Sequence, residues 1–266
     1  MKINRYSYSK INLFNSCPLK YKYLYVDKNY KNDESIEAFL GKITHSTLEW
    51  IYKKKIQDKR TYYSLDSIIH FFKEEWRDSW HQKIRKFKYI KQKKADYFTR
   101  GINFLVKYYH HFGPDFNQKV FKVEEKIEFE LGGHKIKAII DRIDKNTDSE
   151  MHIIDYKTGK NMLDEEKLKG DMQMSIYALA LNSQFNKSDN IKLSHYYVST
   201  NKFVTIDSSD IDINSFSKNL IKNIEVIEKS EKENNFIPNE SKLCNWCYYW
   251  KDCPKKDGEH PSGYLK

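Results

Sequence analysis

The chain has only four cysteines and no long apolar run among its 266 residues. No stretch approaches the roughly 18–20 apolar residues of a membrane-spanning helix. The first ten residues are polar and charged, unlike those of a secretory signal peptide. We therefore expect a cytoplasmic protein with no membrane segment. In such a reducing compartment, a Cys-x2-Cys pair is typical of a metal site rather than of a disulfide. We find no internal repeat.

Basic residues are in excess, with 47 Lys and Arg against 37 Asp and Glu, for a net charge of +10. This excess fits a polyanionic partner such as DNA. Many cations crowd residues 83–94, where Phe87 and Tyr89 are interleaved with Lys83, Arg85, Lys86, Lys88, Lys91, Lys93 and Lys94. The crowding indicates either a channel for a single strand, with phosphate contacts and base stacking, or a solvated helix end or loop.

Two isoleucine-rich runs, residues 135–141 and 151–157, predict the strands of a β-hairpin, because turn-forming residues 145–150 separate them. A turn centred near Asp148 places Asp141 opposite Asp155, and opposed residues bring their Cβ atoms to about 4.5–5.5 Å. Two carboxylates that close repel each other unless a cation bridges them. Because side chains alternate along a strand, Asp155 and Lys157 share a face and Tyr156 lies on the other.

Two carboxylates and a lysine form a set suited to phosphodiester hydrolysis. Hard oxygen ligands favour Mg²⁺ or Mn²⁺, and such an ion activates water and draws charge from a phosphoryl group. We expect Lys157 to stabilise negative charge rather than to accept a proton. The alternative is a solvated Asp/Lys hairpin of the kind common on protein surfaces.

Two segments with helical patterns contain further candidate site residues. Residues 36–52 have apolar side chains at helix spacing, with Gly41, His45 and Glu49 on another stripe. A neutral His45 can bind a metal, and Gly41 leaves room for the hairpin. Residues 168–181 are also predicted to be helical. There Gln173 and Tyr177 share a face, and the pattern indicates either a contact with a phosphate or a base or, as is more common, ordinary residues of a helix surface.

The four cysteines are Cys17 and a triplet near the other end of the chain, Cys244, Cys247 and Cys253. Four thiolates suit either a structural zinc ion or a 4Fe-4S cluster, and their spacing does not distinguish the two. Either metal would join the two ends of the chain as a structural clasp. The aromatic residues between these cysteines, such as Trp246 and Trp250, are expected to shield the metal, or to stack on bases.

Four motifs in order resemble the PD-(D/E)XK nuclease superfamily, and within it the RecB-type nuclease domains. They are Gly41-x3-His45, Ile140-Asp-Arg-Ile-Asp144, Asp155-Tyr-Lys-Thr-Gly-Lys160 and Gln173-x3-Tyr177. The cysteines and the segment from Ser7 to Tyr23 resemble its iron–sulfur branch, which includes AddAB-type and CRISPR-adaptation nucleases. The resemblance covers residues 7–254.

The resemblance implies roles for individual residues. His45, Asp141, Asp155 and the backbone carbonyl of Tyr156 match metal ligands, and Lys157 matches the catalytic lysine. Gln173, Tyr177 and Arg142 are expected to contact DNA. The four cysteines match cluster ligands, which favours 4Fe-4S over zinc. Glu125 is either a carboxylate supporting the site or an exposed strand residue.

The expected fold is α/β, a restriction-endonuclease-like mixed central sheet flanked by helices, with an inserted helical subdomain and a cysteine clasp joining the termini. We expect a single domain over residues 1–256, comprising a helical subdomain at 36–113, a catalytic sheet core at 121–206 and the clasp at 17 and 244–253. Residues 257–266 are expected to be a flexible tail. Further predictions are strands at 121–131, 193–198 and 202–206, and a helix at 214–234.

The expected function is a metal-dependent DNA nuclease, an exonuclease acting on single strands or ends in repair, recombination or defence. One alternative is a catalytically silent module that binds DNA ends as a subunit of a helicase complex. Another is a CRISPR-adaptation nuclease. The presence of Asp141, Asp155 and Lys157 argues against a silent module. Genes for helicases or for adaptation proteins nearby would separate the two pathways.

Overall fold

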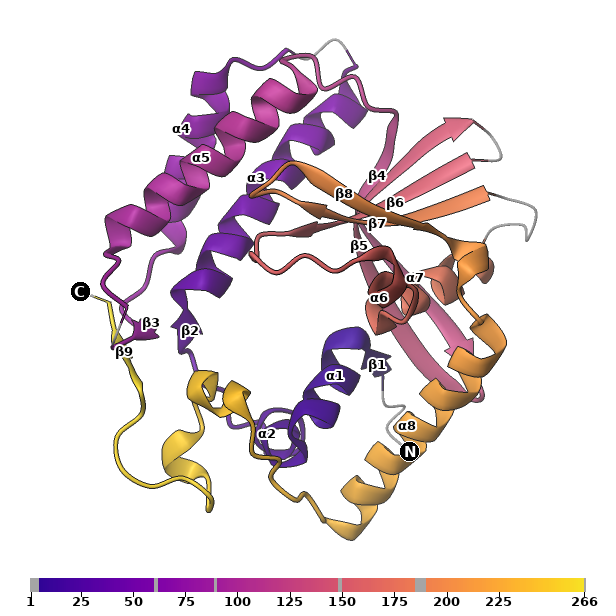
Figure 1. Cartoon of the computed structure of the whole chain (residues 1–266). Coiled ribbons are helices and arrows are strands. Elements are labelled where there is room, and N and C mark those ends of the chain that lie inside the picture. The colour runs from indigo at the N-terminus through magenta and orange to yellow at the C-terminus, as the bar shows by residue number, and fades with distance from the viewer. Residues whose placement is uncertain (1–4, 60–61, 89, 148–149, 185–189, 266) are drawn as a thin grey trace.

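The computed structural model describes residues 5–59, 62–88, 90–147, 150–184 and 190–265. Its centre is a mixed sheet in the order β1-β5-β6-β7-β8, with β4 also paired to β5. The β1–β5 and β6–β7 pairs are parallel and the other pairs antiparallel. This confirms the predicted mixed sheet (Figure 1). The strands are β1 (Arg5–Ser7), β4 (Val120–Leu131), β5 (His134–Thr147), β6 (Glu150–Lys157), β7 (Asn190–Tyr197) and β8 (Lys202–Asp207).

Strand β5 is longer than predicted, because it continues past Asp141 to Thr147. Gly132 and Gly133 have positive φ angles of 56° and 81° and form the turn before it. The β5–β6 ladder pairs Arg142 with Ile154, which is the predicted register. The predicted turn centre, Asp148, lies outside the described residues. Because β5 is so long, β1 pairs with its first half and β6 with its second half.

Three long helices cover one face of the sheet: α3 (Ile36–Gln57), α4 (Leu65–Ser79) and α5 (Lys94–Phe112). The hydroxyls of Ser35 and Ser64 cap the starts of α3 and α4 by accepting a backbone N–H. The apolar sides of these helices form one core with Tyr156 of β6 and Tyr196 of β7. Helices therefore occupy the range predicted to be helical, although the short strand β3 (Ile84–Phe87) interrupts it.

The other face is covered by α1 (Tyr8–Ser16), α7 (Met172–Asn182) and α8 (Ile213–Glu233), which share a second core with the sheet. The helix predicted at 168–181 is confirmed over residues 172–181, but its start is wrong. It is broken into α6 (Glu165–Lys169) and α7 because the Asp171 side chain accepts the Met174 N–H and starts a new helix. None of the described helices is both long and apolar enough to cross a membrane.

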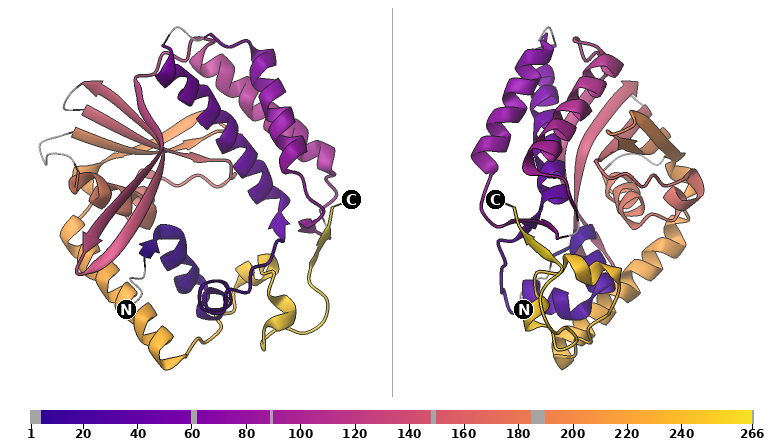
Figure 2. Two further views of the ribbon diagram at one scale, coloured as in Figure 1. Left: turned by 180° about the vertical axis from the view of Figure 1, so that it is seen from behind. Right: turned by 60° about the vertical axis from the view of Figure 1, so that its left-hand side comes forward.

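After α8 the chain returns to its N-terminal part, so that the C-terminal turns lie beside the end of α1, whereas the two termini themselves lie apart (Figure 2). After α1 come α2 (Pro18–Tyr21), a π-helical turn (Lys22–Val26) and β2 (Glu34–Ser35). After β8 comes a 3₁₀ turn (Ser208–Asp210), and after α8 come two more (Lys242–Trp246, Trp250–Asp252) and β9 (Ser262–Tyr264). The expected flexible tail is wrong, because β9 pairs with β3 and the Leu265 N–H donates to the Ile84 carbonyl at 2.8 Å.

We predict that Gly101→Ala destabilises the helical layer. Gly101 of α5 lies where α3 and α4 meet, and an added Cβ would collide with Phe72 and approach Leu40 to 2.9 Å. Overpacking of this kind costs about 1–3 kcal/mol, which exceeds the gain in helix propensity of about 1 kcal/mol. Urea unfolding followed by circular dichroism measures the loss.

The matched control is Gly170→Ala. There the added Cβ would lie at an ordinary 3.7 Å from the Lys167 carbonyl oxygen, at a φ of −90° that alanine adopts freely. We expect no loss of unfolding free energy in the control. A Gly101→Ala protein as stable as the control would contradict the close packing of the three helices.

Candidate active site

The end of β6 presents two charged side chains on one face, as strand alternation predicts. Lys157 Nζ lies 2.7 Å from Asp155 Oδ2. The intervening Tyr156 points to the opposite face and is buried in the helical core. Lys157 is 31% exposed and Asp155 only 4% exposed as side chains, so the pair opens towards solvent on the lysine side.

Asp141 reaches the same place from β5. The ladder between the two strands ends at Arg142 and Ile154, and the next N–H on β6 that faces β5, that of Tyr156, donates to Asp141 Oδ2 at 2.8 Å. The Asp141 carboxylate thus accepts a strand N–H where the backbone ladder has ended, and this hydrogen bond holds the side chain against β6. Burial and the charge of Asp141 raise the pKa of Asp155 above its ordinary value, although Lys157 opposes the shift.

Gln173 and Tyr177 of α7 hold Asp155 in place. Gln173 accepts from Lys157 Nζ at 2.8 Å and donates to Asp155 Oδ1 at 2.7 Å. The Tyr177 hydroxyl lies 3.0 Å from Asp155 Oδ1 and 2.7 Å from the Ile139 carbonyl oxygen. Tyr177 is only 3% exposed, so its expected DNA contact is wrong and its role is to orient the carboxylate. Gln173 is half-buried, and its DNA contact stays a prediction.

His45 approaches from α3. Its Nδ1 lies 3.3 Å from Asp141 Oδ2. Burial would lower the pKa of His45, but the hydrogen bond and charge of Asp141 outweigh it and raise the pKa. One turn earlier, a Cβ on Gly41 would meet the Thr158 hydroxyl at 3.1 Å. This contact supports the expectation that Gly41 allows the end of β6 to approach the helix.

Glu124 is a site residue that the sequence reasoning missed. On β4 the pairs on either side, Val123 with Arg142 and Glu125 with Ile140, place Glu124 opposite Asp141. Its φ of +49° departs from strand geometry. Burial, Asp141 and Glu49 raise the pKa of Glu124 to about 7. Its neighbour Glu125, for which the sequence left open a supporting carboxylate or an exposed strand residue, pairs with Lys122. In the sequence, the one indication of this acidic side of the site was Glu49, which shares a helix stripe with Gly41 and His45.

His195 of β7 was also missed. It pairs with Asp155 in the parallel ladder and is only 2% exposed. Burial and the charge of Lys157 lower its pKa to about 3, so the ring is neutral. Neither ring nitrogen has a hydrogen-bond partner among the described residues. The sequence offered no signal for it, because a lone histidine in an apolar strand does not stand out.

Arg142 does not face DNA, so this expectation is wrong. The residue is 1% exposed. Its Nε donates to Asp144 Oδ1 at 2.7 Å, and a second nitrogen donates to the other oxygen of the same carboxylate. Its remaining nitrogen donates to the hydroxyls of Tyr108 and Tyr156, at 3.1 and 3.3 Å. Arg142 therefore ties β5 and β6 to α5 on the face opposite Asp155 and Lys157.

Comparison with known proteins agrees with this geometry. A family model described as the PD-(D/E)XK nuclease superfamily matches residues 5–254. The chain belongs to the PD-(D/E)XK nuclease superfamily. The fold is similar to that of a "Putative exonuclease" from Eubacterium rectale, with a TM-score of 0.54, 14% identity and coverage of 96% of this chain and 91% of that one. Similarity to the crystal structure of SSO0001 is weaker, with a TM-score of 0.35, 14% identity and coverage of 90% and 96%. Among curated proteins there is no match.

The residues of this PD-(D/E)XK site suit a divalent cation, such as the Mg²⁺ or Mn²⁺ that the superfamily generally uses. Carboxylate oxygens from three strands and an imidazole are the donor types that such ions accept. Burial and the nearby charge of Asp141 raise the pKa of Asp155 and of Glu124, as expected for carboxylates whose repulsion a cation would relieve. In the described part of the chain, no three acidic, His or Cys groups converge tightly enough to hold an ion without adjustment.

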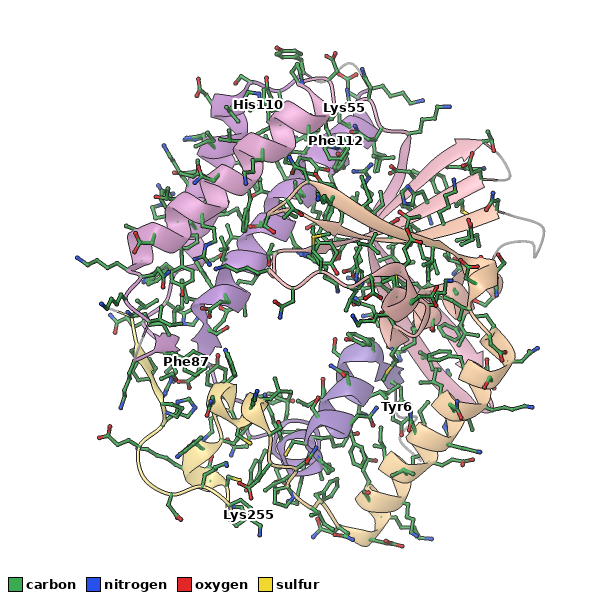
Figure 3. All side chains as sticks on the ribbon, viewed as in Figure 1. Tyr6, Lys55, Phe87, His110, Phe112 and Lys255 are labelled. Carbon is green, nitrogen blue, oxygen red and sulfur yellow. The ribbon has the colours of Figure 1, made fainter. Side chains whose placement is uncertain are left out.

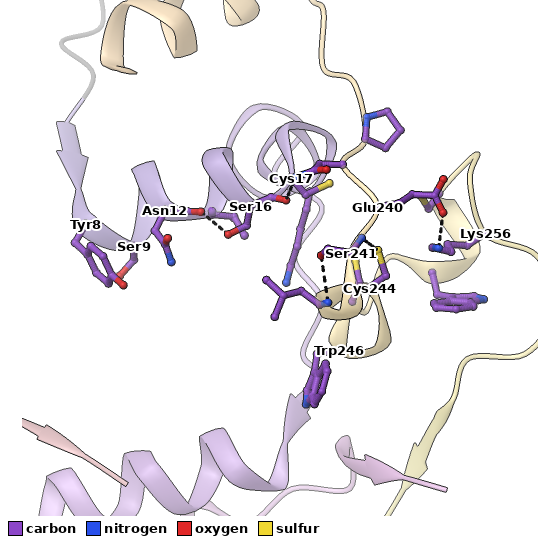
Figure 4. Close-up of a pocket in the computed structure, with 18 residues that line it drawn as sticks. Tyr8, Ser9, Asn12, Ser16, Cys17, Glu240, Ser241, Cys244, Trp246 and Lys256 are labelled. Carbon is purple, nitrogen blue, oxygen red and sulfur yellow. Dashed lines mark hydrogen bonds and ion pairs between the residues drawn. The ribbon is translucent and has the colours of Figure 1, made fainter. Parts of the chain in front are cut away.

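The four cysteines line one cavity of about 340 Å³ between α1, α2 and the C-terminal turns (Figure 4). All four are free thiols. Burial, with Cys17 and Cys244 nearby, raises the pKa of the Cys247 thiol. The tertiary structure therefore brings together cysteines from the two ends of the chain. Trp246 and Trp250 also line the cavity, which agrees with a shielding role.

The basic stretch at 83–94 is largely used within the protein. Arg85 pairs with Asp33, Lys88 pairs with Glu259, and Lys94 lies over the Trp80 ring at 3.6 Å. Phe87 is only 3% exposed and packs against Trp246, so it does not stack on bases. Tyr89 lies outside the described residues. A single-strand channel built on the whole stretch is therefore not supported.

We predict that Arg142→Met destabilises the protein by about 3–5 kcal/mol, because it leaves Asp144 buried and unpaired. The double variant Arg142→Met/Asp144→Leu removes both charges and should recover much of that loss. Denaturant unfolding of the two variants measures both free energies. If Arg142→Met keeps wild-type stability but loses DNA affinity, then Arg142 contacts DNA as first expected and the structural role is wrong.

We predict that the contribution of Glu124 to stability without divalent cations is lost as pH rises from about 4.5 to 7. In the unfolded chain Glu124 ionises near its ordinary 4.5, whereas in the folded protein its pKa is about 7. At Glu124 the folded state therefore binds more protons in this window, and the stability that this group contributes is lost as they leave. Mn²⁺ should raise the melting temperature more at pH 8 than at pH 5.

Relative to wild type, Glu124→Gln should gain stability as pH rises from about 4.5 to 7, and it should reduce the shift caused by Mn²⁺. The matched control is Glu130→Gln, a change at an exposed position on the same strand, which should behave as wild type. Thermal melts at constant ionic strength provide the measurement. Equal pH dependence in the two variants would remove Glu124 from the site.

Proposed function

We propose that this member of the PD-(D/E)XK superfamily is a metal-dependent deoxyribonuclease, acting as an exonuclease on single strands or DNA ends. The observation that carries the proposal is the cluster of Asp141, Asp155 and Lys157 at the junction of β5 and β6. Its carboxylates are braced by backbone and by α7, and its lysine side is open to solvent. A silent DNA-binding module has no need for such an arrangement.

The ligands proposed for the divalent cation are Asp141, Asp155, His45 and the carbonyl of Tyr156, with Glu124 as a further carboxylate. When bound, the ion would lower the pKa of a water molecule and draw charge from the phosphate. Burial lowers the pKa of Lys157, but the charge of Asp155 and the hydrogen bond to it outweigh burial and raise the pKa. Lys157 therefore stays an ammonium group.

As an ammonium group Lys157 is a donor. It stabilises the negative charge that develops on the phosphate oxygens and orients the attacking water. Gln173 holds both Lys157 and Asp155, so the two cannot move independently. The buried, neutral His195 adds no charge beside them. The acidic groups Glu124 and Glu49 line the site on the side of Asp141 and His45, where they are suited to attract a cation.

We predict that Asp155→Asn and Lys157→Met each lower DNA cleavage at least about 100-fold, because each removes one charge acting on the reacting phosphate. The fold should persist, since both side chains lie at the edge of the core. End-labelled single- and double-stranded DNA with Mg²⁺ or Mn²⁺ provides the assay. The matched controls are Asp66→Asn and Lys229→Met, at exposed helix positions, which should cleave as wild type. Cleavage by Asp155→Asn at the control rate would refute the site.

We further propose that the four cysteines hold a 4Fe-4S cluster that clasps the two ends of the chain. The support is their shared cavity and the donor set of four thiolates. Anaerobically purified protein should be brown, with about four irons per chain. Cys17→Ser should lose the iron and unfold at lower temperature.

The matched control is Ser16→Ala. Ser16 lines the same cavity and donates only to the Asn12 carbonyl, so iron content should not change. A colourless protein with one bound zinc would leave the clasp standing and exclude the cluster. Protein without metal and as stable as the loaded form would exclude both. Cluster loss and loss of cleavage are separate readouts, because the thiols are not among the residues that surround Asp155.

A further inference from the structure

A cavity of about 250 Å³, here called the lysine-side cavity, adjoins the loop that follows Lys157. It is enclosed by the start of α3, the start of α5, residues 90–92 and the loop 158–160. Phe87, labelled in Figure 3, ends the strand β3 that leads towards residues 90–92. The residues that give the cavity its chemistry are Leu40, Ile90, Tyr97, Arg100, Thr158 and Lys160.

The floor of the lysine-side cavity is apolar and rigid. Leu40 and Tyr97 are buried and belong to the helical core. The Tyr97 hydroxyl donates to Glu37 Oε1 at 2.9 Å, which ties α5 to the start of α3 and engages the carboxylate that also lines the cavity. Ile90 is half-buried, and its carbonyl accepts a hydrogen bond from Lys86 Nζ, which holds this segment in place. An apolar floor beneath a few polar groups is typical of a small-molecule site.

The rim of the lysine-side cavity supplies hydrogen-bond donors from two elements. The guanidinium of Arg100 lies over the Tyr97 ring, 4.7 Å from its centroid. A guanidinium held in this way presents a fork of N–H donors that matches a phosphate. Lys160 and the Thr158 hydroxyl come from the loop after β6. That loop reaches α3 because Gly41 has no side chain, since a Cβ there would meet the Thr158 hydroxyl at 3.1 Å.

We propose that the lysine-side cavity binds one nucleotide, with Arg100 and Lys160 holding its phosphate and the base packed on Leu40 and Ile90. A substrate strand is the source we favour, and this choice rests on the proposed function. Leu40 precedes His45 by five residues, which is about 7.5 Å along a helix. Since a duplex strand has a phosphate every 3.4 Å or so, the bound nucleotide lies within roughly two steps of the reacting phosphate. A free mononucleotide, such as a cleavage product, is the other source of the same chemistry.

The test compares Arg100→Gln/Lys160→Gln with wild type, without divalent cations. The probes are thymidine 5′-monophosphate, 2-deoxyribose 5-phosphate, which lacks the base, and a 20-nucleotide single strand. In NMR titrations, wild type should bind the monophosphate more tightly than the sugar phosphate, because only the monophosphate buries a base. The variant should bind the monophosphate at least about tenfold more weakly, since it loses hydrogen bonds from charged donors. For the long strand, the slope of log affinity against log salt should flatten by about 1.4, at roughly 0.7 for each lost contact.

Three further variants keep the test independent of folding and of net charge. Lys160→Gln alone lies in an exposed loop, leaves α5 untouched, and should flatten the slope by about 0.7. Arg100→Lys/Lys160→Arg keeps both charges and should keep the slope. The matched control, Lys218→Gln/Lys222→Gln, removes the same charge from exposed positions of α8 and should bind the monophosphate as wild type does.

The outcomes separate the two sources. Weaker monophosphate binding together with a flatter slope assigns the lysine-side cavity to the substrate strand. Weaker monophosphate binding with an unchanged slope assigns it to a free nucleotide. The proposal is overturned if wild type binds the sugar phosphate as tightly as the monophosphate. It is also overturned if the α8 control weakens the monophosphate equally, or if Arg100→Gln/Lys160→Gln binds every probe as wild type does.

Nucleotide binding and cleavage fail independently. If wild-type protein does not cleave DNA but Arg100→Gln/Lys160→Gln loses the monophosphate, the lysine-side cavity stands and the proposed nuclease function does not. If wild type cleaves DNA and the variant binds every probe normally, only the nucleotide site is wrong. In a cleaving enzyme that uses the cavity for its substrate strand, the variant should raise KM by a larger factor than it lowers kcat.

Discussion

The site depends on one hydrogen bond, from the Tyr156 N–H to the carboxylate of Asp141. It holds the side chain of β5 against β6 at the point where their ladder ends, and so brings Asp141 towards Asp155. Two carboxylates this close are unfavourable alone. The surroundings offset the repulsion with Lys157 and the amide of Gln173 next to Asp155, and with His45 next to Asp141.

The two faces of β6 have separate tasks. Asp155 and Lys157 face α7, whose Gln173 and Tyr177 brace them. Tyr156, between them, faces the helical layer, where its hydroxyl meets Arg142 and Tyr108. The buried arginine thus anchors the catalytic strand from behind. A guanidinium and carboxylate buried together contribute little net stability but require both partners, so Arg142 and Asp144 specify how the helical layer meets the sheet.

Local patterns predicted much of this arrangement. The isoleucine-rich runs and the alternation of side chains along a strand were enough to predict the hairpin, its register, and the shared face of Asp155 and Lys157. Helix spacing was enough for α3 and for placing His45. Local sequence patterns failed where the structure of a segment depends on residues that contact it in the fold. Asp171 ended one helix and began another by capping α7. Pairing with β3 ordered the expected tail. Burial under Tyr108 turned Arg142 from an expected DNA contact into a structural residue.

The sequence alone determined the chemistry: which carboxylates, lysine, histidine and thiols exist, and which of them share a strand or helix face. These properties follow from residue type and from the fixed periods of strands and helices. Only the tertiary structure decided which of them meet. Glu124 faces Asp141 and His195 lies beside Asp155 because of how their strands pair in the sheet. Such contacts depend on long-range pairing and on a single unusual φ angle, which no local pattern encodes.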